Sequence, residues 1–291
     1  MGRKISRRKF IAGASAAAGA AGAVSALSGT ARGAEDVPTA PGTDVPLVDF
    51  HVHRDGTTVE KLLEISKARG VKFGIVEHAG LKENKYPIIY SNDEELKGYI
   101  ASLEGKPVYK GVQAEYLDWM TCFSKEAVAQ LDYVLSDAMT IRGPGGARLK
   151  MWEKGFAVGE PQEFMDRYAE FHAEVMALEP LDILANPTWM PEALAKDYDA
   201  LWTEARNKKI IDAALKYNVA IEINSQYCVP RLPFLKLAKA AGVKFSFGSN
   251  IRGPNVGKLD YCVEMIKTLG LTRADMFTPA PPGKKPIQLR K

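Results

Sequence analysis

The sequence predicts an α/β fold, a closed or distorted barrel of parallel strands. After residue 46, about seven strand-like runs alternate with amphipathic helices, and this alternation is typical of parallel sheets. About 255 residues follow the first 34, which is enough for one large domain. A doubly wound open sheet is the main rival, but its usual Gly-rich phosphate loop is missing after the first strand.

Residues 1–34 have the pattern of a twin-arginine signal peptide. MGRKISRRKF is a basic segment, SRRKFI at 6–11 matches the twin-arginine pattern, and the run IAGASAAAGAAGAVSALSG consists of small, mostly apolar residues. A cleavage site fits at Gly29-Thr30-Ala31, and a cut beside Ala34 also fits. The run is weakly hydrophobic for a stable span of about 20 residues, so we favour a cleaved signal over an uncleaved anchor. We expect folded export through the Tat translocon to the periplasm or the medium, with no stable membrane anchor.

The signal segment also explains the basic character of the chain. Six of the 39 Lys and Arg residues and no acids lie in residues 1–34, which leaves 33 bases against 35 acids. The basic pI is therefore no evidence for a nucleic-acid partner, and we expect none. Cys122, Cys228 and Cys262 form no CxxC pair, so they indicate neither a zinc knuckle nor a dense disulfide framework. The sequence leaves open whether two of them form a disulfide.

The elements follow a linker at 35–46 that is rich in Pro, Gly and Thr, and they form one barrel domain at 47–278. A Pro-rich, basic tail at 279–291 is expected to be extended. The strand-like runs are VPLVDFHVH (45–53), KFGIVEHA (72–79), VYKGVQAEYL (108–117), DYVLSDAMTI (132–141), LDILANPTWM (181–190), VAIEIN (219–224) and KFSFGSN (244–250). Helices are expected at 57–70, 91–105, 124–131, 161–178, 203–218, 233–242 and 258–270, several of them opened by Thr or Asn and closed by Gly. GPGGARLK (143–150) is expected to be a loop.

Polar side chains gather at the predicted strand ends, where a parallel barrel carries its reactive groups. His51 and His53 alternate with apolar residues on the first strand, so they share a face with Asp49. His78 ends the second strand beside Glu77. Two imidazoles at this spacing can bind one metal ion, although a structural pair is the alternative. Further candidates follow the other strands: Gln113, Glu115, Asp137, Met139, Asn186, Glu222, Asn224, Asn250 and Arg252.

The remaining histidine and the large apolar side chains are expected to be structural. His172 lies in the middle of a predicted helix. The Trp and Met residues near the strand ends more often pack cores or rims than bind cofactors. They are Trp119, Met139, Trp152, Trp189 and Met190.

These motifs together resemble the polymerase and histidinol phosphatase (PHP) superfamily of metal-dependent phosphoesterases, over nearly the whole chain after the signal. The motifs that match in order are DFHVH-RDG, ARGVKFGIVEHA, GVQAEYL, DYVLSDAM, DILANP, IEIN, FGSNIRGPNVG and LGLTRADMF. The resemblance implies a distorted (β/α)7 barrel with up to three metal ions at its C-terminal rim. It also implies that His51, His53 and His78 are metal ligands, and that Asp55 matches an acidic position that ligates in some members.

Several positions depart from the family pattern. The third-strand Gly-x-Glu motif would place its carboxylate at Gln113, with Glu115 as a stand-in on the same face. Histidines of the fourth and fifth strands appear as Met139 and Asn186. The last motif, Gly-Ser-Asp-x-His, reads GSNIR at 248–252 and so ends in an arginine. Each change removes negative charge or a nitrogen donor, and the arginine adds a permanent cation.

A full cluster of three metal ions is therefore not expected. We expect one divalent ion (Zn, Mn or Fe) held by His51, His53, Glu115 and the carbonyl oxygen of Asn250. Such a site leaves room for water or a small anionic substrate.

We accordingly expect an exported, PHP-like, metal-dependent hydrolase, acting as a phosphoesterase on a small anion. Arg252 would clamp the anion and Glu77 or His78 would be the general acid or base. The substrate would also contact Asp55, Asn186 and Asn224. One alternative is a catalytically inactive relative that binds a ligand without metal. Another is metal-free elimination or isomerisation of a sugar by His78 and Glu115.

Overall fold

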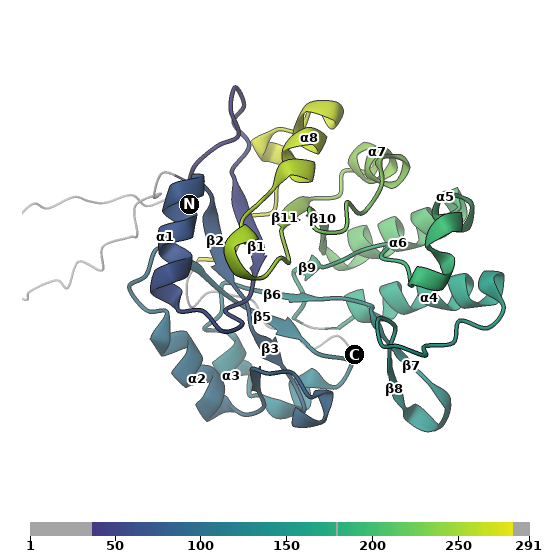
Figure 1. Ribbon diagram of the computed structural model, residues 1–291, viewed down its shortest axis with the longest axis horizontal. Helices are drawn as coiled ribbons and strands as arrows, with labels where there is room; N and C mark the ends of the chain where they lie inside the picture. The colour runs from purple at the N-terminus through teal and green to yellow at the C-terminus, as the bar shows by residue number, and fades with distance from the viewer. Residues whose placement is uncertain (1–36, 179, 282–291) are drawn as a thin grey trace, which may run out of the picture. The chain divides into compact units, whose positions relative to one another are not determined.

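Seven parallel strands close into a barrel in the computed structural model, which describes residues 37–178 and 180–281 (Figure 1). Each strand pairs with the next along the chain, and the last pairs with the first. In ring order the strands are β1 (Val48–Val52), β2 (Lys72–Ile75), β5 (Tyr109–Ala114), β6 (Tyr133–Ser136), β9 (Ile183–Leu184), β10 (Ala220–Asn224) and β11 (Phe245–Gly248). The predicted α/β barrel is confirmed at this level.

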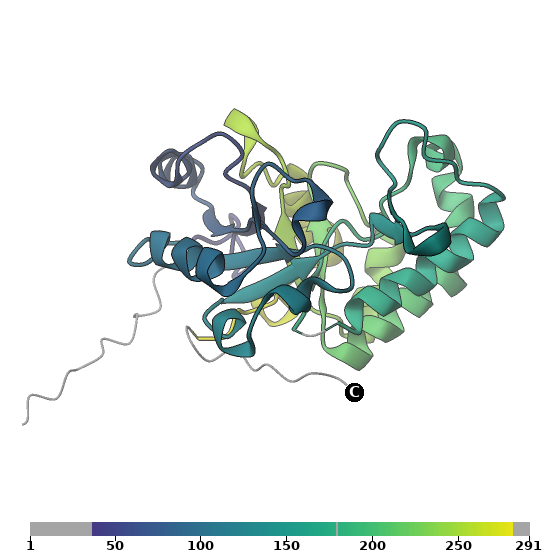
Figure 2. The same cartoon turned by 90° about the horizontal axis from the view of Figure 1, so that it is seen from below.

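Helices connect the strands and surround the barrel, with α4 and α6 lying side by side (Figures 1 and 2). Their bounds are α1 (Val59–Arg69), α2 (Asp93–Ser102), α3 (Lys125–Val128), α4 (Pro161–Met176), α5 (Tyr198–Leu201), α6 (Glu204–Tyr217), α7 (Leu232–Ala241) and α8 (Asp260–Leu269). The predicted signals set the ends of α1. The Thr58 side chain accepts a hydrogen bond from the Lys61 amide, and Gly70 ends the helix in the left-handed region at φ 63°.

Two predicted strands are divided in the structure. The run 72–79 forms β2 and then a separate β3 (His78–Ala79), which pairs with β5 and with β4 (Ile89–Tyr90). The run 132–141 forms β6 and then β7 (Thr140–Arg142). The expected loop at 143–150 is instead the turn and second strand, β8 (Arg148–Lys150), of an antiparallel hairpin. The Gly-rich segment makes this turn because Gly145 and Gly146 adopt positive φ.

The base of the barrel is filled around one tyrosine. The hydroxyl of Tyr133 donates to the carbonyl oxygen of Phe50 at 2.8 Å. Its ring lies so close to Gly74 and Gly111 that a Cβ at either position would overlap it. Because neither glycine has a side chain, the Tyr133 ring fits against both strands. The polar side chains of the candidate site lie at the C-terminal ends of the strands.

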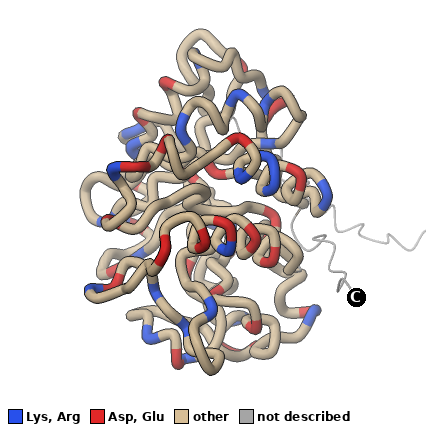
Figure 3. Tube along the Cα trace, turned by 90° about the vertical axis from the view of Figure 1, so that its right-hand side faces the viewer, with Lys and Arg blue, Asp and Glu red and all other residues tan. Residues whose placement is uncertain are grey.

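The expectations for both chain ends lie outside the described residues, namely the signal peptide at 1–34 and all but three residues of the tail at 279–291. Among the residues that the structure does describe, no helix is long and apolar enough to cross a membrane. Lys and Arg positions and Asp and Glu positions are interspersed along the chain trace in the view of Figure 3. Cys122, Cys228 and Cys262 are all free thiols, so no disulfide joins any two of them.

Candidate functional site

A cavity of about 220 Å³ opens where the barrel strands end. Four of the residues that the sequence assigns a role in the site line it: His78, Asn186, Asn250 and Arg252. The complete lining consists of His78, Tyr86, Gln113, Asp137, Met139, Trp152, Asn186, Tyr227, Asn250 and Arg252. The rim therefore combines an imidazole, an acid, a guanidinium, amides and aromatic rings, which is a lining suited to a small polar molecule.

His78 lines this cavity and forms a hydrogen-bonded pair with Glu115, which does not line it. Nδ1 of His78 donates to Oε1 of Glu115 at 2.6 Å. The imidazole also stacks on Tyr86, with ring centroids 3.7 Å apart. Within the described part of the chain, Nε2 of His78 has no hydrogen-bond partner. A carboxylate that holds Nδ1–H leaves Nε2 as the basic nitrogen, so this pair can accept a proton from a bound molecule.

His51 is held by a different carboxylate. Its Nδ1 lies 2.7 Å from Oε1 of Glu222, and both residues are buried. Burial opposes protonation, but the charge and hydrogen bond of Glu222 outweigh it and raise the pKa of His51. Burial would likewise raise the pKa of Glu222, but His51 outweighs it and the pKa is lowered. The two residues therefore form an imidazolium–carboxylate ion pair.

The side chain of Gln113 contacts both His51, in β1, and His53, just after β1. Its Oε1 is 3.1 Å from Nε2 of His51 and 3.1 Å from Nε2 of His53. An amide oxygen only accepts, so both Nε2 atoms carry the proton. Burial lowers the pKa of His53 well below its ordinary value, and nearby His78, His51 and Arg252 lower it further. His53 is therefore neutral, and its buried Nδ1 makes no hydrogen bond in the described structure, with Oε2 of Glu77 3.9 Å away.

Asp137 accepts hydrogen bonds from two side-chain amides. Nε2 of Gln113 and Nδ2 of Asn186 both donate to Oδ2 of Asp137, at 3.2 and 3.1 Å. Burial, and then the charge of Glu115, raise the pKa of Asp137 to about 6, although hydrogen bonds from the Met139 amide and from Asn186 oppose the rise. A carboxyl group with this pKa can exchange a proton near neutral pH.

Arg252 brings a fixed positive charge to the cavity. Its Nε donates to Oδ2 of Asp55 at 2.6 Å, and its Nη1 donates to the carbonyl oxygen of Asn250 at 3.0 Å and to the side-chain oxygen of the same residue. Nη2 has no partner among the residues that the structure describes. Asp55 was expected to contact the substrate, and here it positions the arginine instead.

The four predicted metal ligands do not come together. Glu115 is engaged by His78, and both oxygens of Asn250 accept hydrogen bonds from the Arg252 cation. In the described residues 37–178 and 180–281, no three His, Cys, Asp or Glu side chains form a group that could hold a metal ion. The predicted set therefore does not fit a divalent ion in this structure.

Two more of the predicted site residues lie behind the cavity wall. Glu77 is fully buried and accepts hydrogen bonds from the Arg54 amide and Nε, at 3.1 and 2.8 Å. Asn224 is also fully buried and donates to Asn186 and Glu222. Neither lines the cavity, so Glu77 is not placed as its general acid or base and Asn224 is not placed against a substrate.

The structure adds wall residues that were not assigned to the site from the sequence. They are Tyr86, Trp152 and Tyr227. Gln113, Asp137 and Met139, which the sequence offered as candidates at strand ends without a defined role, also line the cavity. Tyr86 and Tyr227 lie in connecting segments and carry no local pattern that indicates a site. His172 is buried, with its Nδ1 bonded to the Tyr168 carbonyl oxygen at 2.7 Å, which agrees with the expected structural role.

A search against models of known protein families finds no match to this chain, and a search of curated proteins finds none either.

Proposed function

We propose that this chain is an exported hydrolase with a PHP-like barrel, acting on a small anionic substrate, with phosphate esters as the first candidates. The observation that carries the proposal is the hydrogen bond between Glu115 and His78, because His78 lines a cavity that also contains the Arg252 guanidinium. A base with an open nitrogen and a positioned cation are the two groups that hydrolysis of an anionic ester requires.

Each group has a defined role in this proposal. Arg252 binds the anion through its unpartnered Nη2. Nε2 of His78 removes a proton from water as the water oxygen attacks the phosphorus or acyl centre, and Glu115 stabilises the imidazolium that forms. The bond to the leaving oxygen breaks, and Asp137 in its protonated form supplies the proton to that oxygen. His78 then returns its proton to Asp137 through solvent, so the protons balance over one turnover.

The metal-dependent hydrolase expected from the sequence stays a second candidate. The observation that favours it is the Glu222–His51 pair, because a carboxylate on Nδ1 commonly orients an imidazole whose Nε2 binds metal. Nε2 of His51, Nε2 of His53 and Oε1 of Gln113 would then hold the ion, which would supply Lewis-acid activation of the substrate when bound.

The hydrolysis test uses the protein without its signal peptide and p-nitrophenyl phosphate as the probe. We expect His78→Asn to lower kcat/KM by about 100-fold or more and Glu115→Gln by about 10- to 100-fold, which is the usual contribution of general acid–base groups. Glu64→Gln is the matched control, because Glu64 is exposed on α1 and pairs with Lys61. Hydrolysis that is equal in Glu115→Gln and the unmodified protein would show that this pair is not the base.

A further inference from the structure

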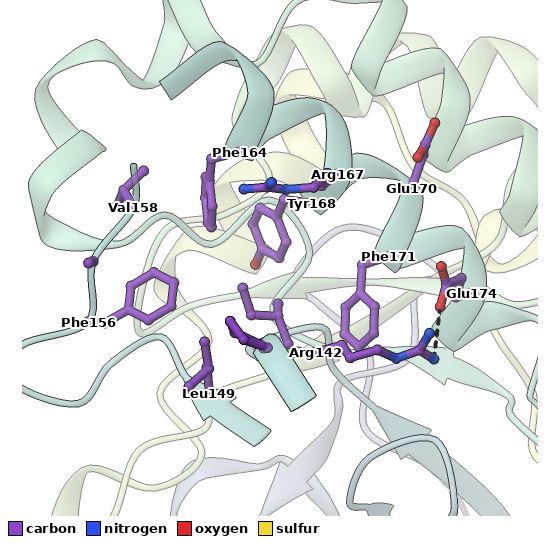
Figure 4. Close-up of a pocket in the computed structure, with 14 residues that line it drawn as sticks. Arg142, Leu149, Phe156, Val158, Phe164, Arg167, Tyr168, Glu170, Phe171 and Glu174 are labelled. Atoms are coloured by element: carbon purple, nitrogen blue, oxygen red, sulfur yellow. Dashed lines mark ion pairs between the residues drawn. The ribbon is translucent and has the colours of Figure 1, made fainter. Parts of the chain in front are cut away.

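A second and larger cavity, of about 490 Å³, lies apart from the barrel rim (Figure 4). Its walls are α4, the β7–β8 hairpin and the segment that connects this hairpin to α4. It shares no lining residue with the cavity at the strand ends. Its volume lies within the range of about 300–1,000 Å³ that is typical of small-molecule sites.

The body of this cavity is apolar and largely aromatic. Phe164 and Phe171 line it from α4 and are buried, and Phe156 lines it from the connecting segment. Leu149 and Ile141, which pair across the hairpin, complete the wall. Figure 4 shows the aromatic rings arranged around one space. Such a lining favours the apolar body of a ligand.

The charges at its edge leave one cation without a partner. Glu174 pairs with Arg142 at 3.7 Å, as the dashed line in Figure 4 marks, and Glu170 pairs with Lys209 at 2.8 Å. Arg167 has no hydrogen bond or ion pair with any residue that the structure describes. Because Lys209, from outside the lining, pairs with Glu170 and Arg142 pairs with Glu174, Arg167 is the charge left to complement an anionic group.

One buried polar atom in the wall also lacks a partner. The hydroxyl of Tyr168 makes no hydrogen bond within the described structure, although the residue is only 1% exposed. Tyr168 lies one residue after Arg167 on α4, and Figure 4 shows its oxygen pointing away from that helix, among the side chains that line the cavity. This oxygen is inaccessible to solvent, so it is not a contact for a bound molecule, and Arg167 remains the polar contact of the cavity.

From these contacts we infer that the second cavity binds a small amphipathic carboxylate. The apolar body lies against the phenylalanines and the hairpin, and the carboxylate lies on Arg167. This site is independent of the hydrolysis proposed at the strand ends, because its residues take no part there.

The test uses displacement of 8-anilinonaphthalene-1-sulfonate from the folded protein by octanoate and by octanol, which share an apolar chain and differ in charge. We expect octanoate to displace the dye about tenfold more effectively than octanol, and Arg167→Gln to reduce this preference to about twofold or less. Arg231→Gln is the control, because it removes an exposed arginine that pairs with Asp199 and lies outside this cavity.

A second variant locates the bound dye. Ala157 is an exposed residue of the lining, so Ala157→Trp fills the cavity without disturbing the core. We expect it to abolish both the dye fluorescence and octanoate binding, while circular dichroism stays unchanged. Equal dye binding by Ala157→Trp and the unmodified protein would overturn the proposal, and so would an octanoate preference that persists in Arg167→Gln.

Discussion

Nε of Arg252 lies 2.6 Å from Oδ2 of Asp55, although the two residues are 197 positions apart in the chain. Arg252 follows β11 and Asp55 follows β1, and these strands are neighbours because the barrel closes there. The carboxylate holds one side of the guanidinium, while Asn250 holds another through Nη1. The arginine is thus a positioned cation with one free nitrogen, which is suited to binding an anion.

The first prediction concerns this cation. Arg252→Gln should weaken the binding of inorganic phosphate by about tenfold or more, because a hydrogen bond to a charged group contributes about 1.5–3 kcal/mol. Arg252→Lys should recover only part of the loss, since an ammonium group cannot hold Asp55, Asn250 and the anion in one plane. Titration calorimetry measures the three affinities. Arg231→Gln is the control, with a similar side-chain exposure of 45% against 41%. Equal affinities in Arg252→Gln and the control would exclude Arg252 as the anion site.

The second prediction concerns the pKa of Asp137, which burial and Glu115 raise to about 6. A carboxyl group with a raised pKa holds its proton more tightly in the folded than in the unfolded chain. The folded protein therefore loses stability as pH rises from about 4 to about 6, and the loss persists above that window. The Asp137→Asn variant has no carboxyl group at this position, so it lacks this pH-dependent loss of stability.

We expect the Tm of Asp137→Asn, relative to the unmodified protein, to be higher at about pH 7 than at about pH 4, by a few degrees. Thermal unfolding followed by circular dichroism at both pH values measures the difference. A relative Tm that is the same at both pH values would show that Asp137 titrates normally in the folded protein.

The third prediction concerns metal content. Gln113 already bonds to both β1 imidazoles, and Asn250 is occupied by Arg252, so we expect well below one metal ion per chain. Mass spectrometry of the purified protein measures this, beside a folded His51→Ala/His53→Ala variant. About one ion per chain that is lost in the variant would instead support the metal-dependent candidate.

The fourth prediction concerns Gly248, which packs against His51 and its partner Glu222. A Cβ at Gly248 would overlap the carboxylate of Glu222 and lie 2.9 Å from the Cβ of His51. Gly248→Ala should therefore displace Glu222 and lower the free energy of unfolding by about 2 kcal/mol or more. Gly98→Ala is the matched control, because Gly98 lies in α2 with open space around it. That change should stabilise the protein by about 0.5–1 kcal/mol. Denaturant unfolding of both variants measures the contrast, and a neutral Gly248→Ala would contradict the packing described.

The sequence alone determined the barrel and most of its element boundaries. Strand and helix patterns are local, and so are the capping residues Thr58 and Gly70, so they can be interpreted without knowledge of distant contacts. It also placed His78 and Arg252 where the strands end, because the C-terminal ends of parallel strands meet at one rim. The sequence does not predict the hairpin at 140–150. Glycines in a turn between two short strands give the same pattern as glycines in a loop between a strand and a helix.

Only the tertiary structure decided which polar groups are partners at that rim. His53 and Gln113 are 60 positions apart, and no local pattern indicates that an amide oxygen would lie between two imidazoles. The same holds for Glu115, whose partner turned out to be His78 rather than the β1 histidines, and for Asn250, whose oxygens face Arg252. Hydrogen bonds of this kind depend on distances of about 3 Å between residues that barrel closure brings together, and residue order does not specify those distances.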